Sequence, residues 1–66
     1  MRNNILYSDM YSFTIEEAAQ YFRLGENKLR QIIKDNPTAN YILKNGNRTQ
    51  IKRKLFEEFL NNQIAI

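Results

Sequence analysis

Side chains that can bind an anion are concentrated in the middle of this 66-residue chain. Nine of its ten lysines and arginines lie between positions 23 and 54, a stretch that holds only two acids, Glu26 and Asp35. Lysine, arginine, asparagine and glutamine donate hydrogen bonds to phosphate oxygens and to the edges of nucleic-acid bases. These residue types and their clustering favour the binding of an anionic partner.

Catalytic and metal-binding chemistry has little support in the sequence. The chain contains no histidine and no cysteine, which removes the commonest general base and the commonest metal ligands. Glu16–Glu17 and Glu57–Glu58 are adjacent pairs, and neighbouring helical residues diverge by about 100°, so neither pair can act jointly on one substrate atom. We expect a binding module without a metal or cofactor, and not an enzyme.

The overall charge and hydrophobicity agree with this expectation. The net charge is +3, which suits nucleic acid. No apolar run approaches the roughly 20 residues of a membrane-spanning helix, so we expect a cytoplasmic protein with no membrane partner. The length fits a single domain over residues 1–66, with an ordered core at about 11–62 and a loose start over residues 1–10.

A short strand or extended lead-in, followed by a helix, is predicted near the start of the core. Tyr11 and Phe13 alternate with polar residues, as in a strand. Thr14 and Glu17 have the spacing of a capping box, in which each side chain bonds the other residue's backbone N–H. Apolar residues at helical spacing follow, and we expect the first helix over residues 15–22.

A second helix is predicted after a turn that contains Gly25. We expect Gly25 to take the positive φ that ends a helix or turns the chain. Leu29, Ile32 and Ile33 then share one helical face, and the pattern stops before Pro37. Two short helices joined by such a turn form a helix-turn-helix.

A β-hairpin is predicted next, because Asn45-Gly46 lies between β-forming residues and suits a type I′ turn with two positive φ angles. A two-residue loop and a four-residue loop at Gly46 both place Ile42, Thr49 and Ile51 on one face, which we expect to point inward. A three-residue loop would break this assignment. The residues expected on the outer face are Tyr41, Leu43, Arg48 and Gln50.

The last predicted helix spans residues 52–62, with an apolar stripe from Leu55 to Leu60 and a frayed tail over residues 63–66. The order helix, turn, helix, hairpin, helix defines the expected fold. It is α+β: a winged helix-turn-helix with three helices, a two-stranded hairpin wing between helices 2 and 3, and a short N-terminal strand.

The candidate binding residues lie on the second helix, the wing and the adjoining segments. When the apolar face of the second helix turns inward, its opposite face centres on Asn27, Gln31 and Lys34. Such a basic face is also common on ordinary solvated helices, but here helix-turn-helix, wing and charge coincide and favour double-stranded DNA. The candidate DNA-binding residues are Arg23, Asn27, Lys28, Arg30, Gln31, Lys34, Lys44, Asn47, Arg48, Lys52, Arg53 and Lys54.

Two segments, residues 13–30 and 45–54, resemble the excisionases of conjugative transposons, which are small winged helix-turn-helix proteins of the MerR-like superfamily. The resemblance implies a protein that binds and bends DNA near the ends of a mobile element and assists a tyrosine integrase in excision. It also implies that the second helix enters the major groove and the wing the minor groove. The chain departs from the family at Tyr41, where we expect a larger aromatic residue such as tryptophan.

Several expectations follow for partners. We expect double-stranded DNA, a tyrosine integrase contacted by residues beyond Phe59, and further copies of the chain on adjacent DNA sites. One alternative is a phage- or plasmid-type transcription regulator that uses the same surface, and another is a protein-interaction module. The DNA hypothesis requires Arg30 and Arg48 to point to the same side of the molecule.

Overall fold

The computed structural model describes residues 10–65, so all but the last residue of the expected loose start over residues 1–10 lies outside the described residues. The elements are β1 (Ser12–Phe13), α1 (Ile15–Phe22), α2 (Glu26–Asp35), β2 (Ile42–Asn45), β3 (Arg48–Lys52) and α3 (Arg53–Asn61). The predicted order of helices and hairpin is confirmed, as is the short N-terminal strand. The chain therefore has the expected winged helix-turn-helix arrangement.

The capping box at the start of α1 is confirmed. The Glu17 backbone N–H donates to Thr14 Oγ1 at 3.2 Å, and the Thr14 N–H donates to Glu17 Oε1 at 2.9 Å. The other end of α1 differs from the prediction. Arg23 takes the left-handed conformation with φ 60°, and its N–H caps the Ala19 carbonyl. Gly25 has φ −70° and begins α2 as its N-cap, so the expectation of positive φ at Gly25 is wrong.

The sheet has the strand order β1-β3-β2, with both pairs antiparallel. Ile42 pairs with Ile51 and Asn45 with Arg48, which leaves a two-residue loop of Gly46 and Asn47. Only Gly46 in this loop has positive φ, at 66°. Positive φ at the first loop position alone matches a type II′ turn, so the predicted type I′ turn at Asn45-Gly46 is wrong.

The predicted inward face of the hairpin is nevertheless correct for its key residue, because Ile51 is fully buried and its partner Ile42 packs against the core. Moving the loop by one residue shifts the register by two and preserves the face of each side chain. Tyr41 is an exception, since it is buried and not on the outer face. It precedes β2, where the strand alternation does not yet apply.

The core joins all parts of the domain. Its buried residues are Phe13, Ala18, Leu29, Ile32, Tyr41, Ile51 and Phe56. Phe56 of α3 lies at its centre, with ring centroids 4.9 Å from those of Phe22 and Tyr41 and 5.4 Å from that of Phe59. α3 is one residue shorter at each end than predicted, because Lys52 still pairs in β3 and Asn62 forms the C-cap.

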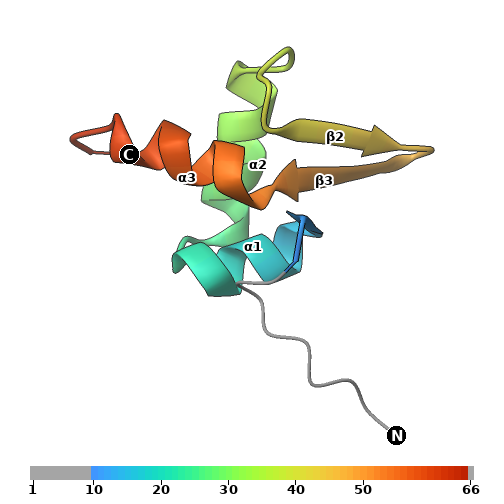
Figure 1. The fold of residues 1–66 in the computed structure, drawn as a ribbon, viewed down its shortest axis with the longest axis horizontal. Helices are drawn as coiled ribbons and strands as arrows, with labels where there is room; N and C mark the ends of the chain where they lie inside the picture. The colour runs from blue at the N-terminus through green and yellow to red at the C-terminus, as the bar shows by residue number, and fades with distance from the viewer. Residues whose placement is uncertain (1–9, 66) are drawn as a thin grey trace, which may run out of the picture.

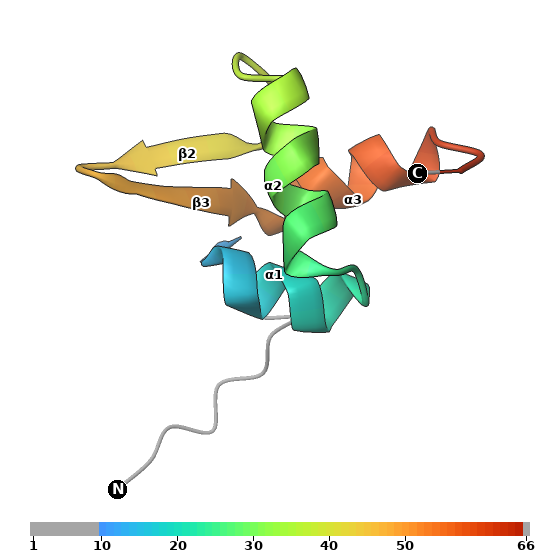
Figure 2. The same ribbon diagram turned by 180° about the vertical axis from the view of Figure 1, so that it is seen from behind.

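The elements project in different directions from this core. α2 lies in the middle, the β2–β3 hairpin extends to one side of it and α3 to the other, and α1 lies beneath (Figures 1 and 2). The base of the hairpin belongs to the three-stranded sheet, and its outer end projects as a wing next to α2. Among residues 10–65, no helix has the length and apolar character needed to cross a bilayer.

Candidate nucleic-acid interface

The outer face of α2 is built by the burial of its inner face. Leu29 and Ile32 are buried and Ile33 packs against the core, which at 100° per residue turns the opposite side of α2 outward. All five candidate residues of α2 are exposed: Asn27, Lys28, Arg30, Gln31 and Lys34. The structure therefore presents the predicted polar and basic face to solvent.

The wing carries its cations at the end far from the core. Lys44, Asn47 and Arg48 are exposed around the Gly46-Asn47 loop. The Lys44 ammonium donates to Thr49 Oγ1 on the paired strand at 3.1 Å, which holds it against the inner face of the hairpin. Arg48 forms no ion pair with the described acidic residues, so its guanidinium is available to a phosphate group.

Arg30 of α2 and Arg48 of the wing line one groove on the surface. The floor and walls of this groove come from three elements: the start of α1, the middle of α2 and the hairpin. Its full lining is Thr14, Ile15, Glu16, Arg30, Asn47, Arg48, Thr49 and Gln50. The two arginines therefore lie on the same side of the molecule, which is the geometry that a DNA interface of α2 and the wing requires.

Five of the lining residues were not among the predicted DNA-binding residues: Thr14, Ile15, Glu16, Thr49 and Gln50. Gln50 could have been found, since the strand alternation already placed it on the face of Arg48. Its Oε1 accepts a 2.7 Å hydrogen bond from the Ser12 hydroxyl and so ties β1 to the wing. Thr14 and Glu16 had no local signal, because they reach the groove only through the packing of α1 beside the hairpin.

Two candidate residues of α2 are held by carboxylates one helical turn away. Arg30 Nη2 lies 3.2 Å from Glu26 Oε1, and both side chains are largely exposed. Gln31 Nε2 donates to Asp35 Oδ1 at 2.9 Å. These contacts use the only two acids between positions 23 and 54.

Three further candidate DNA-binding residues lie away from the groove that Arg30 and Arg48 line. Arg23 is exposed in the turn between α1 and α2, and Lys54 is exposed in the first turn of α3. Lys52 is half-buried at the end of β3, where its backbone N–H donates to the Tyr41 carbonyl at 2.7 Å. Arg23, Lys52 and Lys54 do not line the groove that Arg30 shares with Arg48.

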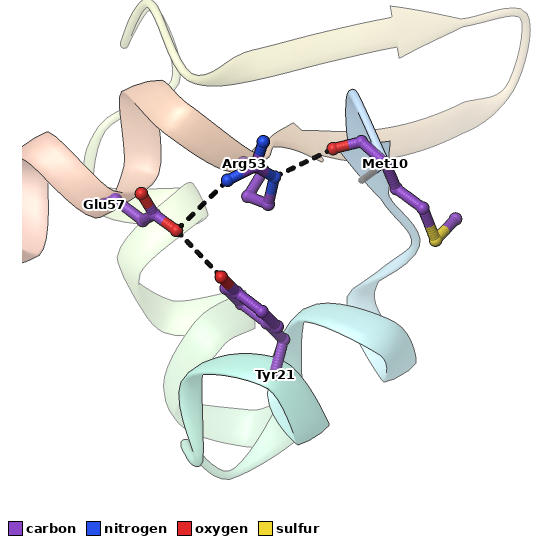
Figure 3. Close-up of polar contacts among 4 residues, drawn as sticks. All are labelled: Met10, Tyr21, Arg53 and Glu57. Carbon is purple, nitrogen blue, oxygen red and sulfur yellow. Dashed lines mark hydrogen bonds and ion pairs between the residues drawn. The ribbon is translucent and has the colours of Figure 1, made fainter. Parts of the chain in front are cut away.

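Arg53 differs from the other candidates because its guanidinium is used inside the domain (Figure 3). Arg53 Nε donates to the Met10 carbonyl at 2.9 Å, and Nη1 lies 3.4 Å from Glu57 Oε2. The Tyr21 hydroxyl donates to the same Glu57 oxygen at 3.0 Å. The side chain of Arg53 is only 16% exposed. The i, i+4 spacing of Arg53 and Glu57 in the sequence was the available indication of this contact.

The described residues contain no cluster of metal-ligating side chains. Over residues 10–65, no three histidine, cysteine, aspartate or glutamate side chains gather as metal ligands do. The pKa of one described group is clearly shifted: burial raises that of the Tyr41 phenol. Tyr41 lies in the core against Phe56 and Phe59, apart from the groove.

Comparison with known proteins assigns the chain to a family. Residues 3–66 match the family described as "Excisionase from transposon Tn916". A curated protein of the same description, from Streptococcus agalactiae serotype V, is 53% identical over 58 residues, which cover 88% of this chain and 87% of the relative. The family consists of non-catalytic DNA-binding proteins of mobile elements. The chain therefore belongs to the family of excisionases from transposon Tn916.

Proposed function

We propose that this excisionase binds double-stranded DNA near the ends of a mobile element, with α2 in the major groove and the wing on the adjacent minor groove or its phosphates. The observation that carries the proposal is that Arg30 and Arg48 line one groove. The major groove of B-DNA admits an α-helix, and a hairpin beside that helix reaches the neighbouring backbone.

The contacting residues divide into two groups by their expected roles. The centre of the outer face of α2, with Asn27, Gln31 and Lys34, faces the base edges, and Arg30 flanks it. Lysines and arginines at the edges contact phosphates: Arg23, Lys28, Lys44, Arg48, Lys52 and Lys54, with Asn47 at the wing tip. Arg53 is left out of the proposed interface, because its side chain is only 16% exposed and its Nε and Nη1 groups contact Met10 and Glu57.

The proposed task is architectural. By holding α2 and the wing against neighbouring grooves, the protein bends the DNA and helps a tyrosine integrase to assemble the excision complex. Such a small binding surface gives weak binding alone, and copies on adjacent sites together with integrase raise the effective concentration. Family membership favours this role over that of a phage- or plasmid-type transcription regulator.

The salt dependence of binding tests the DNA interface. Contacts to about five to seven phosphates give a slope near −0.9 per phosphate in log affinity against log salt concentration. Arg48→Ala should weaken binding equally on all sequences and reduce the slope by about one phosphate. Arg30→Ala should cost about 1–3 kcal/mol at one base pair if Arg30 binds a guanine.

Each outcome of this experiment has a clear meaning. Both side chains are exposed, so equal unfolding midpoints of the variants and the wild type serve as the control for folding. A loss for Arg30→Ala that is equal on all sequences would assign Arg30 to a phosphate. Binding that is insensitive to salt would contradict the proposal as a whole.

We also propose that residues beyond Phe59 contact the integrase. Asn61, Asn62 and residues 63–65 are exposed, and Ile64 is fully exposed, so these side chains are accessible to a partner protein. Truncation of residues 61–66 should abolish integrase recruitment and leave binding to a single DNA site intact. Truncation also removes helix-capping bonds from Asn62 and Gln63, so Ile64→Ser in the full-length chain is the sharper variant. Unchanged recruitment by both variants would reject this contact.

A further inference from the structure

The two carboxylates of α2 occupy positions where an acid is unfavourable for binding DNA. Glu26 and Asp35 are exposed on the helix that carries the candidate base-contacting residues. A carboxylate beside the phosphate backbone weakens binding through charge repulsion. Each carboxylate nevertheless contacts a candidate residue one turn away, Arg30 for Glu26 and Gln31 for Asp35.

These two contacts contribute little to the folding stability of the protein. Exposed i, i+4 pairs contribute little to the free energy of folding, and the side chains of Arg30 and Glu26 are 59% and 45% exposed. Glu26 lies in the first turn of α2, where the helix dipole favours an acid, but Asp35 is the last residue of α2, where the dipole disfavours one. Asp35 therefore has an electrostatic cost both in the free protein and near DNA.

The contact of Asp35 determines which way the amide of Gln31 faces. An ionised carboxylate only accepts hydrogen bonds, so the amide nitrogen of Gln31 must face Asp35 and its oxygen must face away. One N–H and the carbonyl oxygen of Gln31 then remain for another partner. This donor and acceptor match the N7 and N6 groups of adenine, which glutamine binds with two hydrogen bonds.

The contact of Glu26 acts in the same way on Arg30. The carboxylate accepts from one guanidinium nitrogen, Nη2, and restricts the rotamers of a side chain that is otherwise long and mobile. The remaining N–H groups of Arg30 stay available beside the groove that it shares with Arg48. A side chain that is ordered before binding loses less entropy when it contacts a base.

We infer that Glu26 and Asp35 are positioning residues, which orient Arg30 and Gln31 for base contacts and so exchange affinity for sequence specificity. The inference rests on the proposed DNA-binding function. It predicts opposite effects on two measurable quantities: removing either negative charge raises affinity for DNA of arbitrary sequence and lowers the preference for the correct base at one position.

A binding selection on a pool of duplexes with a randomised central segment measures the base preference, and a titration of the unselected pool measures the affinity for arbitrary sequence. Gln31→Ala identifies the base position that depends on Gln31. Asp35→Asn should lower the preference at that same position about threefold or more, a part of the roughly 5- to 150-fold that one bidentate contact supplies. In the Gln31→Ala background, Asp35→Asn should cause no additional loss, because Asp35 acts through Gln31. Arg30→Ala and Glu26→Gln form the equivalent pair.

Matched variants separate positioning from a general effect of charge. Glu58→Gln removes one negative charge from an exposed residue of α3 and should leave every base preference unchanged. Asp35→Glu keeps a carboxylate acceptor and should retain more of the preference than Asp35→Asn.

Three results would overturn the inference or its basis. Base preferences of Asp35→Asn and Glu26→Gln equal to those of the wild type would show that these acids are bystanders. An equal loss with and without Gln31 would show that Asp35 contacts DNA directly. A wild-type protein that selects no sequence and binds without salt dependence would contradict the proposed function itself.

Discussion

Arg53 and Glu57, one turn apart on α3, face each other at 3.4 Å, and each also contacts a segment far away in the sequence. Arg53 reaches the Met10 carbonyl and Glu57 accepts from the Tyr21 hydroxyl. The Arg53 backbone N–H donates in addition to the Tyr11 carbonyl at 3.0 Å. The start of α3 is therefore tied both to the lead-in of β1 and to α1 (Figure 3).

Replacing Arg53 should reduce stability more than it reduces DNA affinity. The ion pair alone contributes little, because Glu57 is 38% exposed, but Arg53→Ala also removes the donor to Met10. We expect a loss of about 1–2 kcal/mol in the free energy of unfolding, measured by urea denaturation. Arg53→Lys should retain part of it, since one ammonium cannot reproduce the planar fork of donors.

Lys54→Ala is the matched control for this experiment, because Lys54 is the exposed neighbour of Arg53. It should change stability by no more than about 0.5 kcal/mol and weaken DNA binding instead. Equal stability of Arg53→Ala and the wild type would contradict the structural role of Arg53.

Most of the fold could be predicted from the sequence, because the local signals for helices, turns and strands all indicate the same arrangement. The capping box at Thr14, the apolar face of α2 and the stop before Pro37 each depend on neighbours within one or two helical turns. The residues of the outer face of α2 followed directly, since burial of Leu29 and Ile32 determines which side chains point outward. Alternation along the hairpin likewise placed Ile51 in the core.

The sequence could not predict the features of the fold that depend on contacts between segments distant in the chain. Tyr41 is buried because the rings of Phe56 and Phe59 pack against it, and strand alternation carries no information about α3. The hydrogen bond from Arg53 to the Met10 carbonyl also joins distant segments and could not be predicted from the local sequence. At both turns the sequence indicated a glycine but not the backbone angles of the turn. In the turn between α1 and α2 the residue with left-handed conformation is Arg23, and the wing loop begins at Gly46.

Arg23→Gly should stabilise the fold and weaken DNA binding. A left-handed conformation costs a residue with a Cβ about 1 kcal/mol relative to glycine, and Arg23 has φ 60°. We therefore expect a rise of about 0.5–1 kcal/mol in the free energy of unfolding. Arg23→Ala loses the same charge but keeps the strain, so it should weaken DNA binding equally without the gain in stability. Equal stabilities of the two variants would show that the turn is not strained.

Gly46→Ala should destabilise the wing through its backbone alone. Gly46 has φ +66°, but a Cβ there would meet no atom within 4 Å, so the cost of about 1 kcal/mol is conformational. Gly25→Ala is the matched control, with open space and φ −70°, and we expect a change within about 0.5 kcal/mol. Urea denaturation gives both values, and equal effects of the two substitutions would refute the role assigned to the Gly46 conformation.

Tyr41→Phe should stabilise the protein at neutral pH. Tyr41 is 2% exposed, and its hydroxyl has no hydrogen-bond partner within the described part of the chain. An unpaired buried hydroxyl costs about 1–3 kcal/mol, so its removal should raise the free energy of unfolding by about 1 kcal/mol. Tyr11→Phe is the control, because Tyr11 is 71% exposed and its hydroxyl remains hydrated in both states.

The same substitution should alter the dependence of stability on alkaline pH. Burial raises the pKa of Tyr41 above its ordinary value of 10.0, so the folded protein retains a proton that the unfolded chain releases. The stability contributed by this group is therefore complete below pH 10.0 and is lost as the pH rises from there through the folded-state pKa. Urea denaturation at increasing pH should show a steeper fall for the wild type than for Tyr41→Phe, with Tyr11→Phe following the wild type. Parallel curves for the wild type and Tyr41→Phe would mean that the Tyr41 phenol is solvated in the folded protein.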